Sequence, residues 1–370
     1  MNFECLQENF NKGLLIVGHL VGRNTTLPIL NNILLRTKEG ILELISTNLE
    51  IGIKTKIRGK VEKEGSYTVP AQLLVNYINL LPNEILKIEK IESTLQIKGK
   101  KYETKIKGIE AEEFPLIPEI KEEKKFQIKN ENLKEGIKKV LSSVKENEIR
   151  PEISGVLFDF QIKEKELILV GTDSYRLTEK KVIFKKNEKD KKVIVPIKTL
   201  QELLRILELE QEERIIEINI SENQILFRIN ETELISRLIS GQYPDYKKII
   251  PQEIKTKAIT SRDDFVKIVK SVGLFSQTEI NDIYLKINPQ ENKMMISSMS
   301  DRKGESTFQL EADLSGEENN IVFNWRYLLD GLNNIDSSEV VLEIVNKDNP
   351  ALLKSLDDKS YLYLIMPIKE

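Results

Sequence analysis

The sequence predicts an α+β protein made of three repeats, each with two helices and several strands. A strand ending near Asn48 recurs 125 positions later near Asp173, and a Val-Pro pair that closes a strand recurs 126 positions apart, at Pro70 and Pro196. A weaker third copy, at Asn324, lacks the proline. Because self-similarity at a fixed period indicates a repeat architecture, we expect three domains, over residues 1–120, 121–250 and 251–370.

Apolar spacing predicts the elements of the first repeat. Phe10, Leu14, Val17 and Val21 follow a helical period and indicate an amphipathic helix. A second short helix is expected after Pro70, ending near residue 82. Short apolar runs predict strands over residues 33–36, 41–45, 85–88, 94–97 and 104–106.

The second and third repeats show the same order of elements. Helices are expected from the apolar residues within 133–144 and 200–207, with strands over 156–160 and 167–170. The third repeat begins with a helix carrying Phe265 and Val272, capped by Ser261 with Asp264 three residues later. Its last helix is expected over 327–335, and the linkers lie at 114–118 and 243–251.

Composition predicts a soluble, cytoplasmic protein. Of 370 residues, 40% are hydrophobic and 31% charged, which suits packed cores with solvated faces. Cys5 is the single cysteine, so no disulfide can form within the chain. No apolar run reaches the ~20 residues of a membrane span, and the first residues lack the pattern of a signal peptide. The net charge of −3 excludes a globally basic nucleic-acid binder but leaves room for a locally basic surface.

The sequence has few of the residues and motifs that form catalytic, metal-binding or nucleotide-binding sites. His19 is the single histidine, and its apolar surroundings predict a partly buried structural role. One chain therefore cannot build a two-histidine metal site or a Ser-His-Asp triad. Phosphate-binding loops of the GxxxxGK[ST] and GxGxxG types are also missing from the sequence. We therefore expect no enzyme, no cofactor and no metal.

Basic residues cluster on the expected helices. At 100° per residue, Lys134, Lys138 and Lys145 fall within roughly 40° of one another. Lys198 and Arg205 are seven positions apart and nearly superpose. On any one helix such lysines indicate ordinary solvation, but their repetition in several repeats favours a surface that faces phosphates without reading sequence. In the third repeat the basic residues are Arg262, Lys267, Lys270 and Arg326.

Several segments, taken in order, resemble one known family. They are Thr26-Leu27-Pro28-Ile29-Leu30, Asn48-Leu49-Glu50, Val69-Pro70, Gly171-Thr172-Asp173-Ser174-Tyr175-Arg176-Leu177, Tyr243-Pro244-Asp245-Tyr246 and Leu364-Ile365-Met366-Pro367-Ile368-Lys369. In this register they resemble the bacterial sliding clamps, the beta subunits of DNA polymerase III. The resemblance covers the whole chain.

The resemblance implies a ring around DNA. The fold class would be α+β, with three repeated domains of the DNA-clamp fold, each with two helices packed on antiparallel sheets, closed into a head-to-tail homodimeric ring. Its helices would line the hole and bind double-stranded DNA without sequence specificity. The DNA-binding residues would then be Arg23, Lys134, Lys138, Lys145, Arg150, Lys198, Arg205 and Lys267.

The resemblance also implies a peptide-binding pocket between the second and third domains. Its partners would be the DNA polymerase III alpha subunit, the clamp loader, other polymerases and repair proteins. Each would bind through a short peptide, with no role for a membrane. The lining carried over is Ile153, Thr172, Ser174, Tyr175, Arg176, Leu177, Pro244, Lys248, Ile249, Leu364, Met366, Pro367 and Ile368, with Arg176, Lys248 and Lys369 at the rim.

The chain departs from this pattern in places. Ser174-Tyr175 stands where many relatives have Gly-His, so the pocket's shape and peptide preference are expected to differ. Gln72 and Leu73 replace basic residues, which leaves mainly Arg23 for DNA in the first domain. The dimer seam is expected near residues 101–107 and near Leu274 and Phe275. Arg302 and Lys303 would alter its charges.

Two other functions stay open on the sequence alone. One is an enzyme that uses Asp173 and Arg176 in a cleft, although Asp173 is better explained as a turn residue. The other is a monomeric scaffold that binds peptides but not DNA. The oligomeric mass would distinguish this scaffold from a clamp.

Overall fold

A computed structural model describes residues 1–22, 26–115, 117, 120, 125–147, 149–184, 190–209, 214–277 and 279–369. The chain divides into two compact units, which are described separately below. The first comprises Met1–Glu131, Phe184–Glu188 and Lys198–Leu238, and the second comprises Asn132–Ile183, Lys189–Ile197 and Ile239–Glu370. No helix of the described residues is long and apolar enough to cross a membrane.

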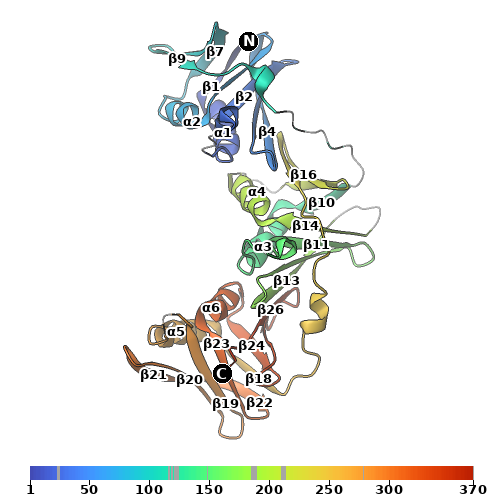
Figure 1. Ribbon diagram of the computed structural model, residues 1–370, viewed down its shortest axis with the longest axis vertical. Coiled ribbons are helices and arrows are strands. Elements are labelled where there is room, and N and C mark those ends of the chain that lie inside the picture. Colours follow the sequence, from blue (N-terminus) through green and yellow to red (C-terminus); the bar gives the residue numbers. More distant parts are fainter. Residues whose placement is uncertain are drawn as a thin grey trace. The chain divides into compact units, whose positions relative to one another are not determined.

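Two antiparallel sheets form the frame of the first unit (Figure 1). The larger has the order β10-β15-β16-β17-β4-β3-β2-β6, and the smaller has the order β5-β1-β7-β8-β9. The strands are β1 Asn2–Leu6, β2 Asn32–Lys38, β3 Ile41–Thr47, β4 Ile51–Arg58, β5 Lys60–Lys63, β6 Gly65–Pro70, β7 Ile85–Ile91, β8 Thr94–Lys98, β9 Glu103–Lys107, β10 Lys125–Lys129, β15 Ile215–Ile220, β16 Gln224–Ile229 and β17 Thr232–Arg237.

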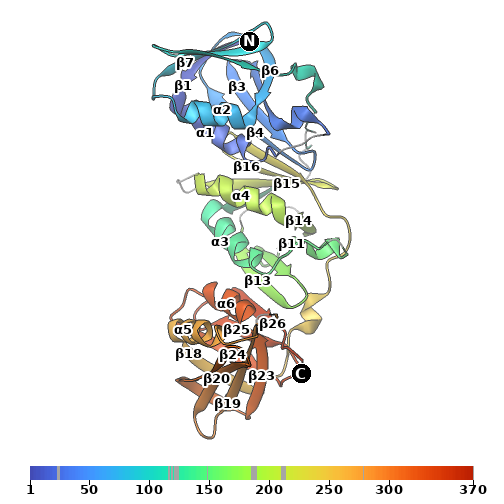
Figure 2. The same ribbon diagram turned by 60° about the vertical axis from the view of Figure 1, so that its left-hand side comes forward.

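The helices of the first unit are α1 Gln7–Gly18, α2 Ala71–Asn79 and α4 Ile197–Leu209, with short 3₁₀ turns η1 Pro28–Asn31 and η2 Ala111–Glu113. Helices α1 and α2 pack side by side, and α1 also packs on β3 and β4 (Figure 1 and Figure 2). The absent side chain of Gly13 permits this approach, because a Cβ there would lie 2.6 Å from Ile57 Cδ1. The smallest residue therefore sets the distance between helix and sheet.

The second unit is also built on two antiparallel sheets, with the orders β14-β11-β12-β13-β26-β25-β24-β18-β22 and β21-β20-β19-β23. Its strands are β11 Gly155–Gln161, β12 Glu166–Thr172, β13 Arg176–Ile183, β14 Lys191–Pro196, β18 Thr256–Ser261, β19 Asp282–Asn288, β20 Lys293–Ser300, β21 Gly304–Leu310, β22 Ala312–Gly316, β23 Asn319–Asn324, β24 Glu339–Ile344, β25 Ala351–Ser355 and β26 Tyr361–Ile365.

The helices associated with the second unit are α3 Asn130–Leu141, α5 Arg262–Gly273 and α6 Trp325–Asn333, with 3₁₀ turns η3 Pro151–Ile153 and η4 Tyr246–Ile249. Helices α5 and α6 pack side by side over a buried cluster that includes Phe265, Phe323 and Leu328 (Figure 2). The Ser261 Oγ accepts the Asp264 N–H at 3.3 Å, so the predicted cap of α5 is confirmed.

The third copy of the repeat is visible at the junctions between strand and helix. Strands β6, β14 and β23 end at Pro70, Pro196 and Asn324, each directly before a helix. The Asn324 side chain accepts the backbone N–H groups of Arg326 and Tyr327, which satisfies two of the free donors at the start of α6. A capping asparagine thus stands where the other copies have proline, and this explains why the third copy is hard to recognise.

Some predicted details are wrong. Helices α1, α2 and α3 end before Val21, Leu81 and Val144, although Val21 and Val144 are buried. Helix α6 begins and ends two residues earlier than expected. The His19 side chain is 63% exposed rather than partly buried, and its Nδ1 contacts a carboxylate oxygen of Glu202. The predicted domain limits stay a prediction.

Candidate functional site

The turn between β12 and β13 is an Asx turn, as expected for Asp173. One carboxylate oxygen of Asp173 accepts the N–H groups of Tyr175 and Arg176, at 3.1 and 3.2 Å. The Thr172 hydroxyl donates to the Arg176 carbonyl at 2.7 Å and accepts the Ser174 N–H. Ser174 has φ = +76°, a conformation that costs free energy for a residue with a side chain.

The first unit contains the same turn between β3 and β4. Asn48 Oδ1 accepts the N–H groups of Glu50 and Ile51, and the Thr47 hydroxyl repeats the two bonds made by Thr172. Leu49 has φ = +76°, like Ser174. The two repeats thus match bond for bond, except that a neutral amide replaces the carboxylate and Ile51 replaces the arginine.

Arg176 connects this turn to helix α6. Its guanidinium donates to Asp173 at 3.1 Å and to Asp330, and it lies over the Tyr327 ring at 4.4 Å from the centroid. Arg176 is only 5% exposed. Burial alone would lower its pKa, but the carboxylates of Asp330 and Asp173 raise the pKa overall, so the charge is retained.

The burial of Arg176 changes its predicted role. The sequence places this arginine at the polar rim of a pocket, whereas its guanidinium is buried and committed to two carboxylates. The same bonds account for Asp173 and Arg176 without an active-site cleft. Among the described residues, no group of three or more His, Cys, Asp or Glu is placed to hold a metal ion.

An aromatic pair covers Arg176. The Tyr175 ring stacks on the Tyr327 ring at 6.3 Å between centroids, and Tyr175 is 61% exposed. Lys145 Nζ lies 5.1 Å from the Tyr327 centroid and 3.8 Å from Asp173 Oδ2. The prediction that Lys145 shares a helix face with Lys134 and Lys138 is wrong, because α3 ends at Leu141.

Pairing of β13 with β26 brings distant apolar residues together. Leu177 lies opposite Leu364, and both belong to a buried cluster with Leu157, Ile168 and Val170. Leu177 and Leu364 are each 1% exposed, and so is Ile153. These three predicted lining residues are therefore core residues of the second unit, and any groove must be formed by their more exposed neighbours.

The segment after Ile239 crosses this cluster. Tyr243 and Tyr246 are buried in it, donating hydrogen bonds to the Val170 carbonyl and the Glu179 carboxylate at 3.1 and 2.7 Å. Burial raises the pKa of both phenols, so they remain neutral donors. Pro244 is half-buried, while Lys248 and Ile249 are exposed. Two tyrosine anchors thus fix the segment and present Ile249 to solvent.

The chain's last described residues return to the same place. The Met366 N–H donates to the Tyr175 carbonyl at 2.8 Å, and the Ile368 N–H donates to the Val322 carbonyl at 2.8 Å. Met366 packs against the buried cluster while remaining partly exposed, and Pro367 is buried. The structure therefore brings together the segments at 172–177, 244–249 and 364–368, although they lie far apart in the sequence.

The basic residues differ in their availability for phosphate. Lys134 and Lys138 extend from α3 and form no ion pair within the described part of the chain. Lys267 is exposed on α5 and lies 3.6 Å from Asp264. Lys198 is exposed at the start of α4. These four residues remain candidates for contact with DNA.

The other predicted DNA-binding residues are placed differently. Arg205 donates to the Leu15 and Ile16 carbonyls of α1, at 2.9 and 2.5 Å, and to Glu202, so its guanidinium links two helices rather than facing solvent alone. Arg150 pairs with Glu152 at 3.1 Å and lies 3.5 Å from the Ser174 hydroxyl. Arg23 lies outside the described residues.

Sequence reasoning missed Tyr327 and Asp330 as members of this site. They lie one helical turn apart on α6, so both can reach Arg176. Only their spacing of three residues could have indicated a shared face. That spacing does not indicate that Arg176 is the residue which both side chains contact.

Comparison with known proteins identifies the family. Profiles of the DNA polymerase III beta subunit match residues 1–118 (N-terminal domain), 127–245 (central domain) and 247–369 (C-terminal domain). The chain belongs to the DNA polymerase III beta subunit family. The beta sliding clamp of Staphylococcus epidermidis is 31% identical over 380 residues, covering 100% of this chain and 99% of that protein. That of Synechococcus elongatus is 27% identical, with the same coverage.

Solved structures of sliding clamps have the same fold as this chain. The crystal structure of the DNA polymerase sliding clamp from Bacillus subtilis has a TM-score of 0.94 at 28% identity, covering 100% of this chain and 99% of that one. The predicted three-domain clamp fold, with helices on antiparallel sheets, is therefore confirmed. The predicted function of a DNA sliding clamp is confirmed with it.

Proposed function

We propose that two copies of this beta subunit close head to tail into a ring that encircles duplex DNA without catalysing a reaction. The ring holds the polymerase III alpha subunit, the clamp loader and other replication or repair proteins through short peptides, in the bacterial cytoplasm. The observation that carries the peptide site is the convergence of three remote segments around Tyr175, Ile249 and Met366. The domain limits of 1–120, 121–250 and 251–370 belong to the same proposal.

The site has the chemistry of a peptide groove. Its base is the closed core around Leu177 and Leu364, which gives a rigid apolar floor. Partly exposed Met366 packs against this core, and the segments that meet it carry the exposed side chains of Ile249 and Tyr175. Methionine adapts its shape to different side chains, as a groove with several partners requires. Lys248, 3.0 Å from Asp245, supplies a charged rim.

Replacing Ile249 by Glu, or Met366 by Ala, should weaken binding of a peptide from the polymerase III alpha subunit at least ~10-fold, because anchor residues carry most of the energy in such sites. Fluorescence anisotropy with labelled peptide measures the change. Ile183→Glu is the matched control, since Ile183 is an exposed isoleucine of the same unit. Affinity within twofold of the parent for both folded variants would place the groove elsewhere.

Exposed sheet edges support head-to-tail closure. Strand β9 is the last strand of its sheet in the first unit, and β21 is the last strand of its sheet in the second. Leu274 and Phe308, at the end of α5 and on β21, are both exposed. Uncovered edges and apolar residues are avoided unless another chain covers them. Lys303 donates to the Ser276 carbonyl at 2.8 Å, so this cation is engaged within its own unit.

Sedimentation velocity at micromolar concentration should give twice the 42.7 kDa chain mass. Leu274→Asp should shift the population to monomer, because a charge would be buried in the apolar seam. Leu356→Asp changes an exposed leucine of the same unit and should leave the dimer intact. A parent protein that sediments only as monomer would favour the peptide-binding scaffold over the ring.

A further inference from the structure

Each repeat has a row of three residues that crosses one face of its sheet. In the first repeat Leu34 of β2 lies between Thr68 of β6 and Ile45 of β3, directly opposite both. The corresponding rows are Ile194, Leu157 and Val170 in the second repeat and Val322, Tyr284 and Ser297 in the third. Residues directly opposite one another on neighbouring strands face the same side of a sheet, so each row forms one strip of surface.

In each repeat the chain comes back to this row at the same residue. Backbone bridges join Ile109 and Ile239 to the first residues of their rows. In the third repeat the Ile368 N–H donates to the carbonyl of the first residue, Val322, at 2.8 Å. The correspondence between the repeats therefore includes the segment that follows the strands.

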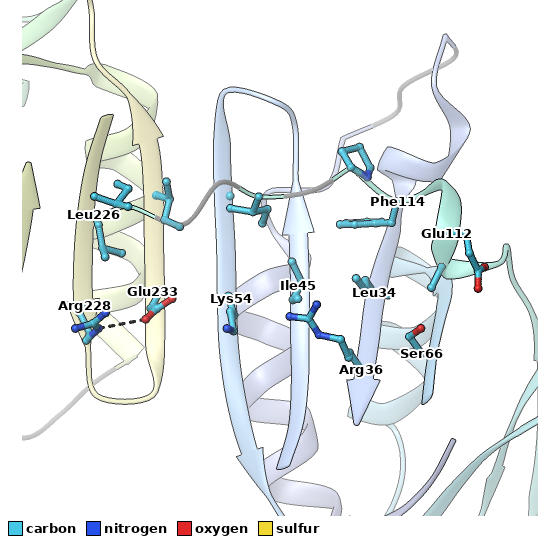
Figure 3. Close-up of a pocket in the computed structure, with 16 residues that line it drawn as sticks. Leu34, Arg36, Ile45, Lys54, Ser66, Glu112, Phe114, Leu226, Arg228 and Glu233 are labelled. Carbon is cyan, nitrogen blue, oxygen red and sulfur yellow. Dashed lines mark hydrogen bonds and ion pairs between the residues drawn. The ribbon is translucent and has the colours of Figure 1, made fainter. Parts of the chain in front are cut away.

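In the first two repeats this segment covers the row with an aromatic side chain. Phe114 is 6% exposed and packs with Leu34 and Ile45 (Figure 3). Tyr243 is 9% exposed and lies in the buried cluster that contains the whole second row. Each linker thus places one ring on the same strip of its sheet.

A proline follows the aromatic residue in both linkers, at Pro115 and Pro244. The residue before a proline is confined to extended conformations, and the proline itself has no N–H that needs an acceptor. An aromatic–proline pair is therefore suited to crossing the face of a sheet without pairing with a strand.

Among the described residues, the row of the third repeat has no such cover. Tyr284 is 40% exposed. A cavity of about 420 Å³ lies over the row and is lined by Val322, Tyr284, Ser297 and Ile368. This volume lies within the range of ligand pockets, about 300–1,000 Å³.

The third row has its own chemistry. Tyr284 and Ser297 stand where the other rows have two aliphatic residues, so the strip offers an aromatic face on which another ring can stack. Charges at the rim are mixed, since Lys286 lies 3.8 Å from Glu318 and Asp348 lines the cavity with the lysines. We therefore expect a ring, rather than a charge, to select the ligand.

We propose that this cavity binds an extended segment of a partner protein in which an aromatic residue precedes a proline, as in the chain's own two linkers. Ile368 is also a predicted residue of the peptide groove, so the two sites adjoin. The inference rests on the proposed function only in that the segment comes from a protein that the clamp holds. A partner with segments for both sites would bind with raised avidity.

The probe is a fluorescein-labelled peptide with the sequence of the second linker, Ile-Ser-Gly-Gln-Tyr-Pro-Asp-Tyr, and its binding to the full-length protein is measured by anisotropy. A matched probe has serine as its fifth residue. The tyrosine probe should bind at least ~10-fold tighter, because a buried aromatic anchor carries much of the binding energy. It should shift the methyl resonances of Ile321 and Ile368, which line the cavity, in NMR spectra.

Substitutions in the third row locate the binding. Tyr284→Ala removes the exposed ring and should weaken the tyrosine probe at least ~10-fold, whereas Tyr284→Phe should retain its binding. Met299→Ala is the matched control, because Met299 is an exposed residue of the same sheet that does not line the cavity.

Equal affinity for the two probes, or parental binding by Tyr284→Ala, would overturn the inference. Loss of the probe in Ile249→Glu but not in Tyr284→Ala would also overturn it, since the probe would then occupy the groove. Failure of the proposed function appears in a different measurement, as unchanged binding of the polymerase III alpha peptide by Ile249→Glu.

Discussion

Replacing Arg176 by Met is expected to destabilise the second unit by about 3–5 kcal/mol, the usual effect of removing one partner of a buried ion pair. The Asp173 side chain is only 5% exposed and would lose its closest cation. Asp330 and the Tyr327 face would lose their contacts as well. Trp325, the single tryptophan, is the first residue of α6 and packs against the buried cluster of the second unit, so its fluorescence reports the unfolding of this unit in urea.

The other repeat supplies the control for this experiment. In the first unit the same turn is made with Asn48 and Ile51, a neutral amide and an apolar residue. The double variant Asp173→Asn, Arg176→Met should therefore recover much of the loss, because no buried charge remains. Lys248→Met removes a cation from an exposed pair and should change stability by less than ~1 kcal/mol. A similarly small effect of Arg176→Met alone would show that the buried pair does not hold α6 to the turn.

Local patterns predicted the elements well where a period or a cap was present. Helix α5 follows from its apolar spacing and from Ser261, and the Asx turn follows from Asp173 between two strands. The seams could not be predicted, because a strand's pattern shows which face is buried but not which strand is its neighbour. Nothing near β4 in the sequence indicates that it pairs with β17, or that β13 pairs with β26.

The same limit applies to the site. The sequence could name Arg176 and Arg205 as cations, but their burial depends on partners far along the chain. Asp330 is 154 residues from Arg176, and the α1 carbonyls are about 190 residues from Arg205. Lys138 is exposed and Lys134 is half-buried on α3, where the exposure of a side chain depends mainly on the face of its own helix, and their contact with DNA stays a prediction.

Charge reversal of Lys134 and Lys138 is expected to weaken the retention of the clamp on DNA. Both side chains extend from α3 without an ion pair in the described part of the chain, so each can neutralise a phosphate. Each lost contact lowers the slope of log affinity against log salt by about 0.9. Losing two phosphate contacts at physiological salt should lower the affinity for DNA roughly 30-fold. Repulsion between the new glutamates and the phosphates adds to this loss. Retention is measured on primed circular DNA as the length of processive synthesis at increasing salt.

The control variant has the same change in net charge as the α3 variant, but at two lysines outside the helices. Lys163→Glu with Lys359→Glu alters two exposed lysines, one in the turn after β11 and one in the loop before β26. If helix lysines face the DNA, the control should retain the parental salt slope while the α3 variant loses about 1.8 units of it. Equal behaviour of the two variants would mean that net charge, and not the α3 surface, governs retention.

Because the Arg205 guanidinium donates hydrogen bonds to α1 carbonyls, Arg205→Glu should lower the stability of the first unit and not the retention on DNA.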